Sequence, residues 1–124
     1  MQRKTPKLLG DIRDAAGFIM KLTSGKALVD YKTDRVLRQT VERNFEIIGE
    51  AINRLARSDA GTVTLIPSYQ RIISFRNVLS HGYDLIDDAT VWKVIQNELP
   101  ELLAQVTSLL GRDHLEFPGD DRVE

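Results

Sequence analysis

The sequence has 124 residues, of which 42% are hydrophobic and 28% charged, with no cysteine and a formal net charge of -1. These proportions are typical of one globular domain that folds without a metal ion or a disulfide bond. The absence of cysteine excludes thiol redox chemistry and cysteine-ligated zinc. No stretch approaches the roughly 18 consecutive apolar residues of a membrane helix, and acidic residues stand near the start, where a signal peptide needs an apolar run. We therefore predict a cytoplasmic protein that does not enter a membrane.

Charge is unevenly distributed along the chain. Residues 1–57 hold 12 basic and 7 acidic residues, residues 58–110 hold 3 and 6, and residues 111–124 hold 2 and 5. A net charge near zero argues against a non-specific nucleic-acid coat, whose affinity comes from neutralising many phosphates. Five arginines nevertheless fall along one predicted helix: Arg35, Arg38, Arg43, Arg54 and Arg57. They form either a solvated helix face or a wall that faces phosphate groups.

Apolar residues recur at steps of three and four in two long stretches, which is the pattern of amphipathic helices. The first predicted helix begins at Pro6 and ends near Gly25. The second begins at Thr33 or Asp34, either of which can cap it, and continues to a break at residues 58–61. The apolar stripe of this second stretch is the clearest helix signal in the sequence.

A third helix is predicted after a short connection. Residues 62–66 are β-branched and apolar, but they are too few for a strand and have no second strand to pair with, so we interpret them as a loop. Pro67 suits the first turn of the third helix, which should stop around His81 and Gly82.

Helical periodicity returns in the last part of the chain. Asp87 or Asp88 caps the last helix, and Pro100 inside it removes a backbone hydrogen bond, so we expect a kink or a break next to that residue. Residues 111–124 lack periodicity and are acidic, which predicts a flexible tail. Residues 1–110 contain no repeat or linker and are predicted to form one all-α domain, an up-and-down bundle of four to five helices.

Motifs of several enzyme classes are absent. The sequence has neither of the glycine-rich phosphate-binding patterns, G-x-x-x-x-G-K-[ST] or G-x-G-x-x-G. His81 and His114 lie 33 positions apart, a poor arrangement for zinc. Glu42, Glu46 and Glu50 line up at four-residue steps, but a di-iron bundle also needs Glu-x-x-His pairs that this chain lacks. We therefore predict neither a metal ion nor a cofactor.

Residues with chemical potential concentrate in the pattern R-N-x-x-x-H-x-Y, formed by Arg76, Asn77, His81 and Tyr83. Histidine can accept and donate protons near neutral pH, and arginine is a fixed cation suited to a phosphoryl oxygen. Five residues on a regular helix turn by about 500°, so the arginine and histidine would lie about 140° apart. They would converge if the helix loosens near Gly82, or if the histidine reaches across to a partner chain. Such a pair could cleave RNA without a metal ion.

Each of these residues also has a structural alternative. Arg76 could be the ion-pair partner of Glu46 or Glu50, and His81 could interact with the dipole of its own helix. The asparagine could be a polar surface residue, and the tyrosine a core aromatic with its hydroxyl at the surface. Spacing alone does not choose between the catalytic and the structural interpretation.

The motif and its surroundings resemble the HEPN superfamily and, within it, the HepT-like toxins of prokaryotic toxin–antitoxin modules. The superfamily motif is an arginine, a polar residue and, after a gap, a histidine, matched here by Arg76, Asn77 and His81. HepT-like members add a tyrosine two residues later, matched by Tyr83. The resemblance covers about residues 8–110. It includes the stretch from Arg43 to Ala51, Phe75, the Val91-Trp92 pair and the stretch from Leu99 to Leu102.

The resemblance implies an all-α homodimer in which two copies of the motif line a shared cleft, and a metal-independent endoribonuclease toxin. It also implies neutralisation by an MNT-type nucleotidyltransferase antitoxin that transfers AMP to Tyr83. His81 would act as general acid or base, Arg76 would stabilise charge on the phosphorane, and Asn77 would orient the phosphate or the histidine. From the arginines of the second helix, we expect Arg43 and Arg54 to contact RNA phosphates.

A second hypothesis belongs to a different functional class. The chain could be a non-catalytic module that pairs with a nucleotidyltransferase and binds nucleotide through Arg76 and His81. This hypothesis predicts nucleotide binding or complex formation without turnover of RNA. A purely structural helical dimer would leave the four polar residues of the motif unexplained.

Overall fold

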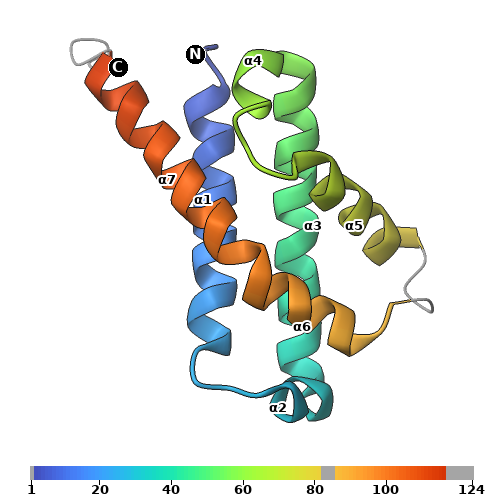
Figure 1. The fold of residues 1–124 in the computed structure, drawn as a ribbon. Coiled ribbons are helices and arrows are strands. Elements are labelled where there is room, and N and C mark those ends of the chain that lie inside the picture. The colour runs from blue at the N-terminus through green and yellow to red at the C-terminus, as the bar shows by residue number, and fades with distance from the viewer. Residues whose placement is uncertain (1, 82–85, 117–124) are drawn as a thin grey trace.

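A computed structural model of the chain describes residues 2–81 and 86–116, with residues 112–116 described as backbone alone. These residues form seven helices and no strand, which confirms the predicted all-α class. The helices are α1 (Thr5–Thr23), α2 (Leu28–Thr33), α3 (Arg35–Ser58), α4 (Ala60–Val63), α5 (Tyr69–His81), α6 (Asp88–Asn97) and α7 (Leu99–Glu116). Figure 1 shows α1 and α3 side by side, with α7 packed against α1 and α5 against α3.

The apolar stripes of the two longest helices meet in the centre of the bundle. Leu9, Ile12 and Ile19 on α1 are fully buried, as are Ile48 and Ile52 on α3. Burying each such side chain stabilises the fold by about 1.5–3 kcal/mol. The three- and four-residue spacing of these positions therefore explains both the helices and the way they pair.

Three of the predicted helix boundaries are confirmed, at Asp34, at Asp87 and beside Pro100. Asp34 caps α3, with its Oδ1 accepting a hydrogen bond from the backbone N–H of Leu37 at 3.0 Å. Asp87 caps α6 through the N–H groups of Ala89 and Thr90. The chain breaks between α6 and α7, and Pro100 occupies the first turn of α7, where its missing N–H has no helical partner to lose.

Two short helices were not predicted from the sequence. The first is α2, whose six residues are too few to display a periodic pattern. Its Tyr31 is fully buried and packs against Trp92 of α6, with the ring centroids 5.6 Å apart. Burial, followed by the nearby carboxylates of Glu42 and Asp88, raises the pKa of the tyrosine hydroxyl. This uncharged, buried tyrosine therefore holds α2 in contact with α6.

The second unpredicted helix is α4, so the interpretation of residues 62–66 as a loop is wrong for the part that lies in this helix. Val63 and Ile66 are buried and attach the connection to the core. Helix α5 does not begin at Pro67, so the predicted start of the third helix is also wrong. Ser68 adopts a left-handed conformation (φ 60°), and its carbonyl accepts the first hydrogen bonds of the helix that starts at Tyr69.

The last helix is longer than the sequence pattern indicated. Helix α7 continues to Glu116, so the predicted domain end at residue 110 falls inside a helix and residues 111–116 are not irregular. The rest of the predicted flexible tail, residues 117–124, lies outside the described residues, and there the prediction stays a prediction. Over the residues that the structure describes, no helix has the length and apolarity needed to cross a membrane.

The carboxylate of Asp59 ties the start of the chain to the end of α3. Its oxygens accept hydrogen bonds from the Gln2 N–H at 3.1 Å, the Thr5 hydroxyl at 2.6 Å, and the Thr62 hydroxyl and N–H at 2.8 and 3.2 Å. Burial by itself raises the pKa of this carboxyl, but these hydrogen bonds outweigh it and lower the pKa from 3.8 to about 2. The charged form is therefore the one that the fold stabilises.

Replacing this carboxylate should destabilise the protein in a pH-dependent way. We expect Asp59→Ala to lower the free energy of unfolding at pH 7 by about 1–2 kcal/mol, the usual effect of losing a helix cap. The pKa of Asp59 is lower in the folded than in the unfolded protein. The difference in free energy of unfolding between wild type and the variant should therefore disappear as the pH falls from about 4 towards 2. Urea unfolding at several pH values measures the difference, with Asp14→Ala on the exposed face of α1 as the control. A difference that stays constant down to pH 2 would contradict the assignment.

Candidate functional site

Arg76 lies on the side of α5 that packs against α3. Ile72 and Leu79 bury one stripe of α5, and Phe75 stands edge-on to Phe45 of α3, with the ring centroids 5.1 Å apart. The side chain of Arg76 is 28% exposed, so most of it is covered by this contact between the two helices. The apolar packing of α5 thus holds the arginine with its root buried and its charged end near the surface.

A glycine on α3 allows this close approach. A Cβ atom on residue 49 would overlap the Cβ of Arg76 and lie 2.5 Å from its Cγ. Non-bonded carbon atoms do not approach one another so closely. Glycine inside a helix costs about 1 kcal/mol relative to alanine. The cost is explained here because any larger residue would push α5 away from α3.

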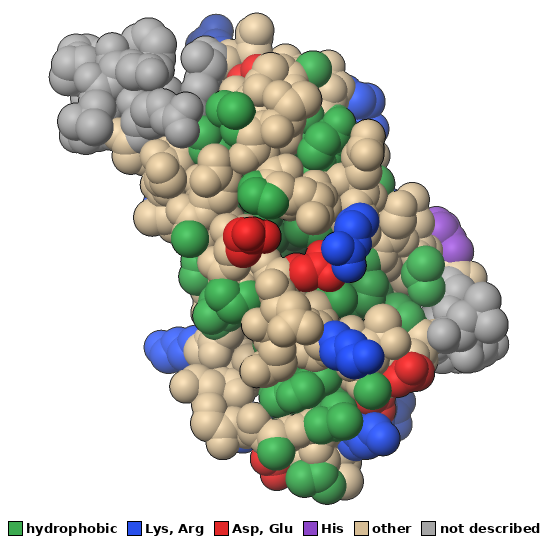
Figure 2. All heavy atoms as spheres, in the orientation of Figure 1, with side chains coloured by type: hydrophobic (Ala, Val, Ile, Leu, Met, Phe, Trp, Pro, Cys, Tyr) green, Lys and Arg blue, Asp and Glu red, His purple; other side chains and the backbone are tan. Residues whose placement is uncertain are grey.

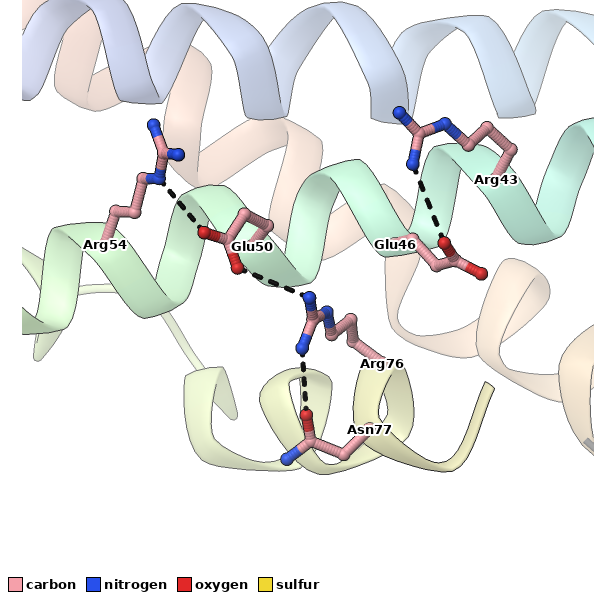
Figure 3. A network of polar contacts seen from close by, with 6 residues as sticks. All are labelled: Arg43, Glu46, Glu50, Arg54, Arg76 and Asn77. Carbon is pink, nitrogen blue, oxygen red and sulfur yellow. Dashed lines mark hydrogen bonds and ion pairs between the residues drawn. The ribbon is translucent and has the colours of Figure 1, made fainter. Parts of the chain in front are cut away.

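The guanidinium of Arg76 makes polar contacts on both sides, as Figure 3 shows. Its Nη2 donates to Glu50 Oε1 at 3.4 Å and its Nη1 donates to Asn77 Oδ1 at 3.2 Å. The other oxygen of Glu50 accepts from Arg54 Nε at 3.0 Å, so one carboxylate serves two arginines. The Nε of Arg76 is buried and has no hydrogen-bond partner among the described residues.

These charged groups border a cavity of about 260 Å³ between α1, α3 and α5. Figure 3 shows Arg43 and Arg54 extending from α3 towards α1, while Arg76 points from α5 towards α3. Arg43 is paired with Glu46 at 3.6 Å. The structure therefore brings together Arg76 and the two arginines expected to contact phosphates. The lining consists of Leu8, Asp11, Arg43, Glu46, Ile47, Glu50, Ala51, Arg54 and Arg76.

His81 is separate from this cavity. It is the last residue of α5, and its side chain is exposed. In Figure 2 the histidine colour appears at the outer surface of the molecule. The helix stays regular through Ser80 and His81, so the loosening considered from the sequence does not occur at these two positions. No hydrogen bond or ion pair joins His81 to Arg76 within the described part of the chain. Gly82 and the predicted AMP acceptor Tyr83 lie outside it.

The observed contacts agree with the structural alternatives considered for Arg76 and Asn77. Arg76 is an ion-pair partner of Glu50, one of the two carboxylates considered for it, and Asn77 is an exposed residue that contacts the arginine. These contacts are compatible with a site, because a guanidinium has five N–H donors and only two are used here. Among the described residues, no group of three or more His, Cys, Asp or Glu residues could hold a metal ion.

Comparison with known proteins identifies the family. The family model described as Ribonuclease HepT-like matches residues 12–109. The chain belongs to the HepT-like ribonuclease family. This membership confirms the resemblance to the HEPN superfamily noted in the sequence. No solved structure matches the chain at a significant level.

Several HepT-like relatives align with nearly the whole chain. A protein of Caldanaerobacter subterraneus subsp. tengcongensis named "Putative RNase" is 31% identical over 111 residues, covering 89% of this chain and 98% of the relative. A protein of Methanocaldococcus jannaschii with the same name is 26% identical over 105 residues, with 85% and 95% covered. A "Probable ribonuclease HepT" of Thermococcus cleftensis is 28% identical over 109 residues, with 88% and 98% covered.

Sequence reasoning missed Gly49 as part of the candidate site. The signal that could have found it is a single glycine between Ile48 and Glu50, inside the strongest helical pattern of the chain. A glycine at such a position is unfavourable unless packing requires it. The missing information was which helix would lie against it, and that depends on the tertiary structure.

The contact at Gly49 predicts opposite effects for two glycine-to-alanine substitutions. Gly49→Ala should lower the free energy of unfolding by about 1–3 kcal/mol, because the new methyl group overlaps the backbone-proximal atoms of Arg76. Gly17→Ala on α1 meets no atom within 4 Å and should raise it by about 0.5–1 kcal/mol through helix propensity. Urea unfolding of both variants tests this, and equal shifts of the same sign would contradict the close contact.

Proposed function

We propose that this chain is a metal-independent endoribonuclease that acts as the toxin of a toxin–antitoxin module. The observation that carries the proposal is the position of Arg76, held by Gly49 and Glu50 at a cavity that two further arginines border. Asn77 and His81 follow it at the spacing of the family motif. The names of the HepT-like relatives support RNA as the substrate.

Cleavage in this proposal uses the 2′-hydroxyl of the RNA as the nucleophile. Removal of its proton by an imidazole lets the oxygen attack the adjacent phosphorus, while a protonated imidazole gives its proton to the departing 5′ oxygen. The products are a 2′,3′-cyclic phosphate and a 5′-hydroxyl. His81 supplies the imidazole, and two chains of a dimer would supply one as base and one as acid.

Arg76 stabilises the charge that develops on the phosphorane in this proposal. Its contacts with Glu50 and Asn77 fix the plane of the guanidinium before RNA arrives, so little reorganisation is needed during the reaction. Two of its terminal N–H groups remain available for phosphoryl oxygens. Asn77, which accepts from Arg76, orients the arginine or the phosphate.

A homodimer is part of the proposal, because Arg76 and His81 do not meet in one chain. Its support is an apolar cavity of about 420 Å³ between α5 and α6, lined in part by Ile72, Phe75 and Val78. Val78 is 40% exposed and lies on the helix that carries the motif, so part of the apolar lining is open to a partner. A second copy covering this surface would bring two motifs close to each other.

The ribonuclease proposal is tested with RNA in the presence of EDTA. Wild type should cleave, and Arg76→Ala and His81→Ala should each lower the rate by about 100-fold or more, since each removes a group that acts in the transition state. Gel analysis of labelled RNA and detection of the cyclic phosphate end measure the outcome. Cleavage at equal rates by all three proteins, or by none, ends the proposal.

Two controls accompany this experiment. Light scattering of each variant, expected to report two chains per particle, separates lost chemistry from lost assembly. The matched variant His114→Ala removes the other histidine of the chain and should cleave like wild type. Nucleotide or RNA binding by wild type without turnover would favour the non-catalytic binding module instead.

We further propose that an MNT-type nucleotidyltransferase neutralises the toxin by modifying Tyr83. The tyrosine oxygen attacks the α-phosphorus of ATP, the AMP group is transferred and pyrophosphate leaves. The modification adds bulk and a negative phosphodiester two residues from His81, which should exclude RNA by the same logic as phosphorylation.

Intact-mass measurement tests the modification directly. After incubation with ATP and the cognate nucleotidyltransferase, the chain should gain the mass of one or more adenylyl groups and lose ribonuclease activity. Tyr83→Phe should remain unmodified and active, while Tyr69→Phe serves as the matched control and should behave like wild type. Modification of Tyr83→Phe to the same extent as wild type would exclude Tyr83 as the acceptor.

A further inference from the structure

A groove between α1 and α3 continues from the Arg76 cavity to the end of the bundle where the chain starts. The Arg76 cavity and a larger one of about 750 Å³ share three lining residues, Leu8, Asp11 and Arg54. The larger cavity adds Lys4, which directly precedes α1, and Lys7 from its first turn, together with Arg57 and Ser58 from the last turn of α3. The two cavities therefore form one depression, which we call the α1–α3 groove.

The α1–α3 groove carries an excess of positive charge. Its lining contains six cations and three carboxylates. The carboxylates are already paired: Asp11 with Lys7 at 2.7 Å, Glu46 with Arg43, and Glu50 with both Arg54 and Arg76. Lys4 and Arg57 make no ion pair with any described residue. The end of the groove away from Arg76 thus has the least compensated positive charge.

The length of the groove suits a short stretch of single-stranded RNA. Residues 43, 46, 50, 54 and 57 recur at steps of three and four, so they form one stripe along α3. From Arg43 to Arg57 the helix rises by about 21 Å at 1.5 Å per residue. That length corresponds to about six nucleotides of a stacked strand at roughly 3.4 Å each. The stripe is therefore long enough to contact several phosphates in succession.

The groove lacks the aromatic platforms on which single-strand binders stack bases. Its lining contains no aromatic residue, and its apolar members are Leu8, Ile47 and Ala51. Single-strand binders that hold the bases use aromatic platforms, whereas contacts to the backbone need only cations. A strand in this groove would accordingly be held by its phosphates, without preference for sequence.

We propose that single-stranded RNA lies along the α1–α3 groove, with its backbone over Lys4, Lys7, Arg54 and Arg57 and the scissile phosphate at Arg76. This inference rests on the proposed ribonuclease function, because it places the rest of the substrate relative to the same arginine. In this proposal Lys4, Lys7, Arg54 and Arg57 act in binding, and Arg76 alone among the cations of the groove takes part in bond cleavage.

Binding of RNA to two charge-matched triple variants tests the groove. The groove variant is Lys4→Ala/Lys7→Ala/Arg57→Ala. The control is Lys21→Ala/Lys26→Ala/Lys32→Ala, whose exposed lysines lie at the other end of α1, in the connection that follows it, and on α2. Both are made in a His81→Ala background so that RNA is bound but not cut. The probe is a fluorescent single-stranded RNA of about 12 nucleotides, followed by anisotropy over a range of salt concentrations.

The salt dependence of RNA binding reports how many phosphate contacts are lost. Each phosphate contact to a single strand contributes about 0.7 to the slope of log K against log salt, so losing three contacts should reduce the slope by about 2. The control should keep the slope of its parent. Equal reductions in the two triple variants would mean diffuse attraction and would overturn the proposal, as would an unchanged slope in the groove variant. Circular dichroism melting confirms that both variants are folded.

Cleavage assays with His81 restored distinguish failure of this inference from failure of the ribonuclease proposal. If the groove is correct, the groove variant should have a raised KM and a retained kcat on long RNA. Equal KM values in the two triple variants would overturn the groove while ribonuclease activity stands. Groove-dependent binding without cleavage by wild type would leave the groove as an RNA-binding site and end the ribonuclease proposal.

Discussion

The candidate site depends on the contact between Gly49 of α3 and Arg76 of α5. Because no side chain separates the two helices at this level, the root of the arginine is buried in their interface while its guanidinium reaches the surface. The edge-on packing of Phe75 against Phe45 fixes the same part of α5 one residue earlier. In the proposed mechanism Arg76 meets developing charge, and such a group works best when packing has already oriented it, as apolar packing does here.

The carboxylate of Glu50 controls the electrostatics of this region. It lies 3.0 Å from Arg54 and 3.4 Å from Arg76, so it reduces the repulsion between two guanidinium groups that line one cavity. Exposed ion pairs of this kind stabilise a fold by at most about 1 kcal/mol. The effect of Glu50 is therefore mainly on orientation: it keeps both arginines directed into the cavity, where a phosphate can share them.

The sequence predicted those parts of the structure that local chemistry determines. The stripe of α3, the caps at Asp34 and Asp87, and the break beside Pro100 each follow from residues that act within one turn. Helices α2 and α4 were not predicted because they are too short to show a period. The turn at Ser68 places the start of α5 at Tyr69 instead of Pro67. Their positions are set by buried side chains whose partners are distant in sequence.

The candidate site around Arg76 could be predicted from the sequence to a similar degree. The resemblance singled out Arg76, Asn77 and His81, and charge alone suggested Glu50 as a partner of the arginine. Neither could reveal that Gly49 supports the arginine or that Arg43 and Arg54 share its cavity, because both facts require α1, α3 and α5 to be assembled. The periodicity of α5 did give the correct relation of His81 to Arg76, since the helix remains regular between them.

The atom of residue 76 that comes nearest to Gly49 is its Cβ, which every amino acid except glycine possesses. The demand for glycine on α3 is therefore independent of the side chain that residue 76 carries beyond its Cβ. A descendant of this protein that replaced the arginine by any residue other than glycine would still be held to glycine at position 49 by the shape of the fold. Retention of that glycine in a lineage is accordingly a record of architecture, and it carries no information about the role of the residue opposite.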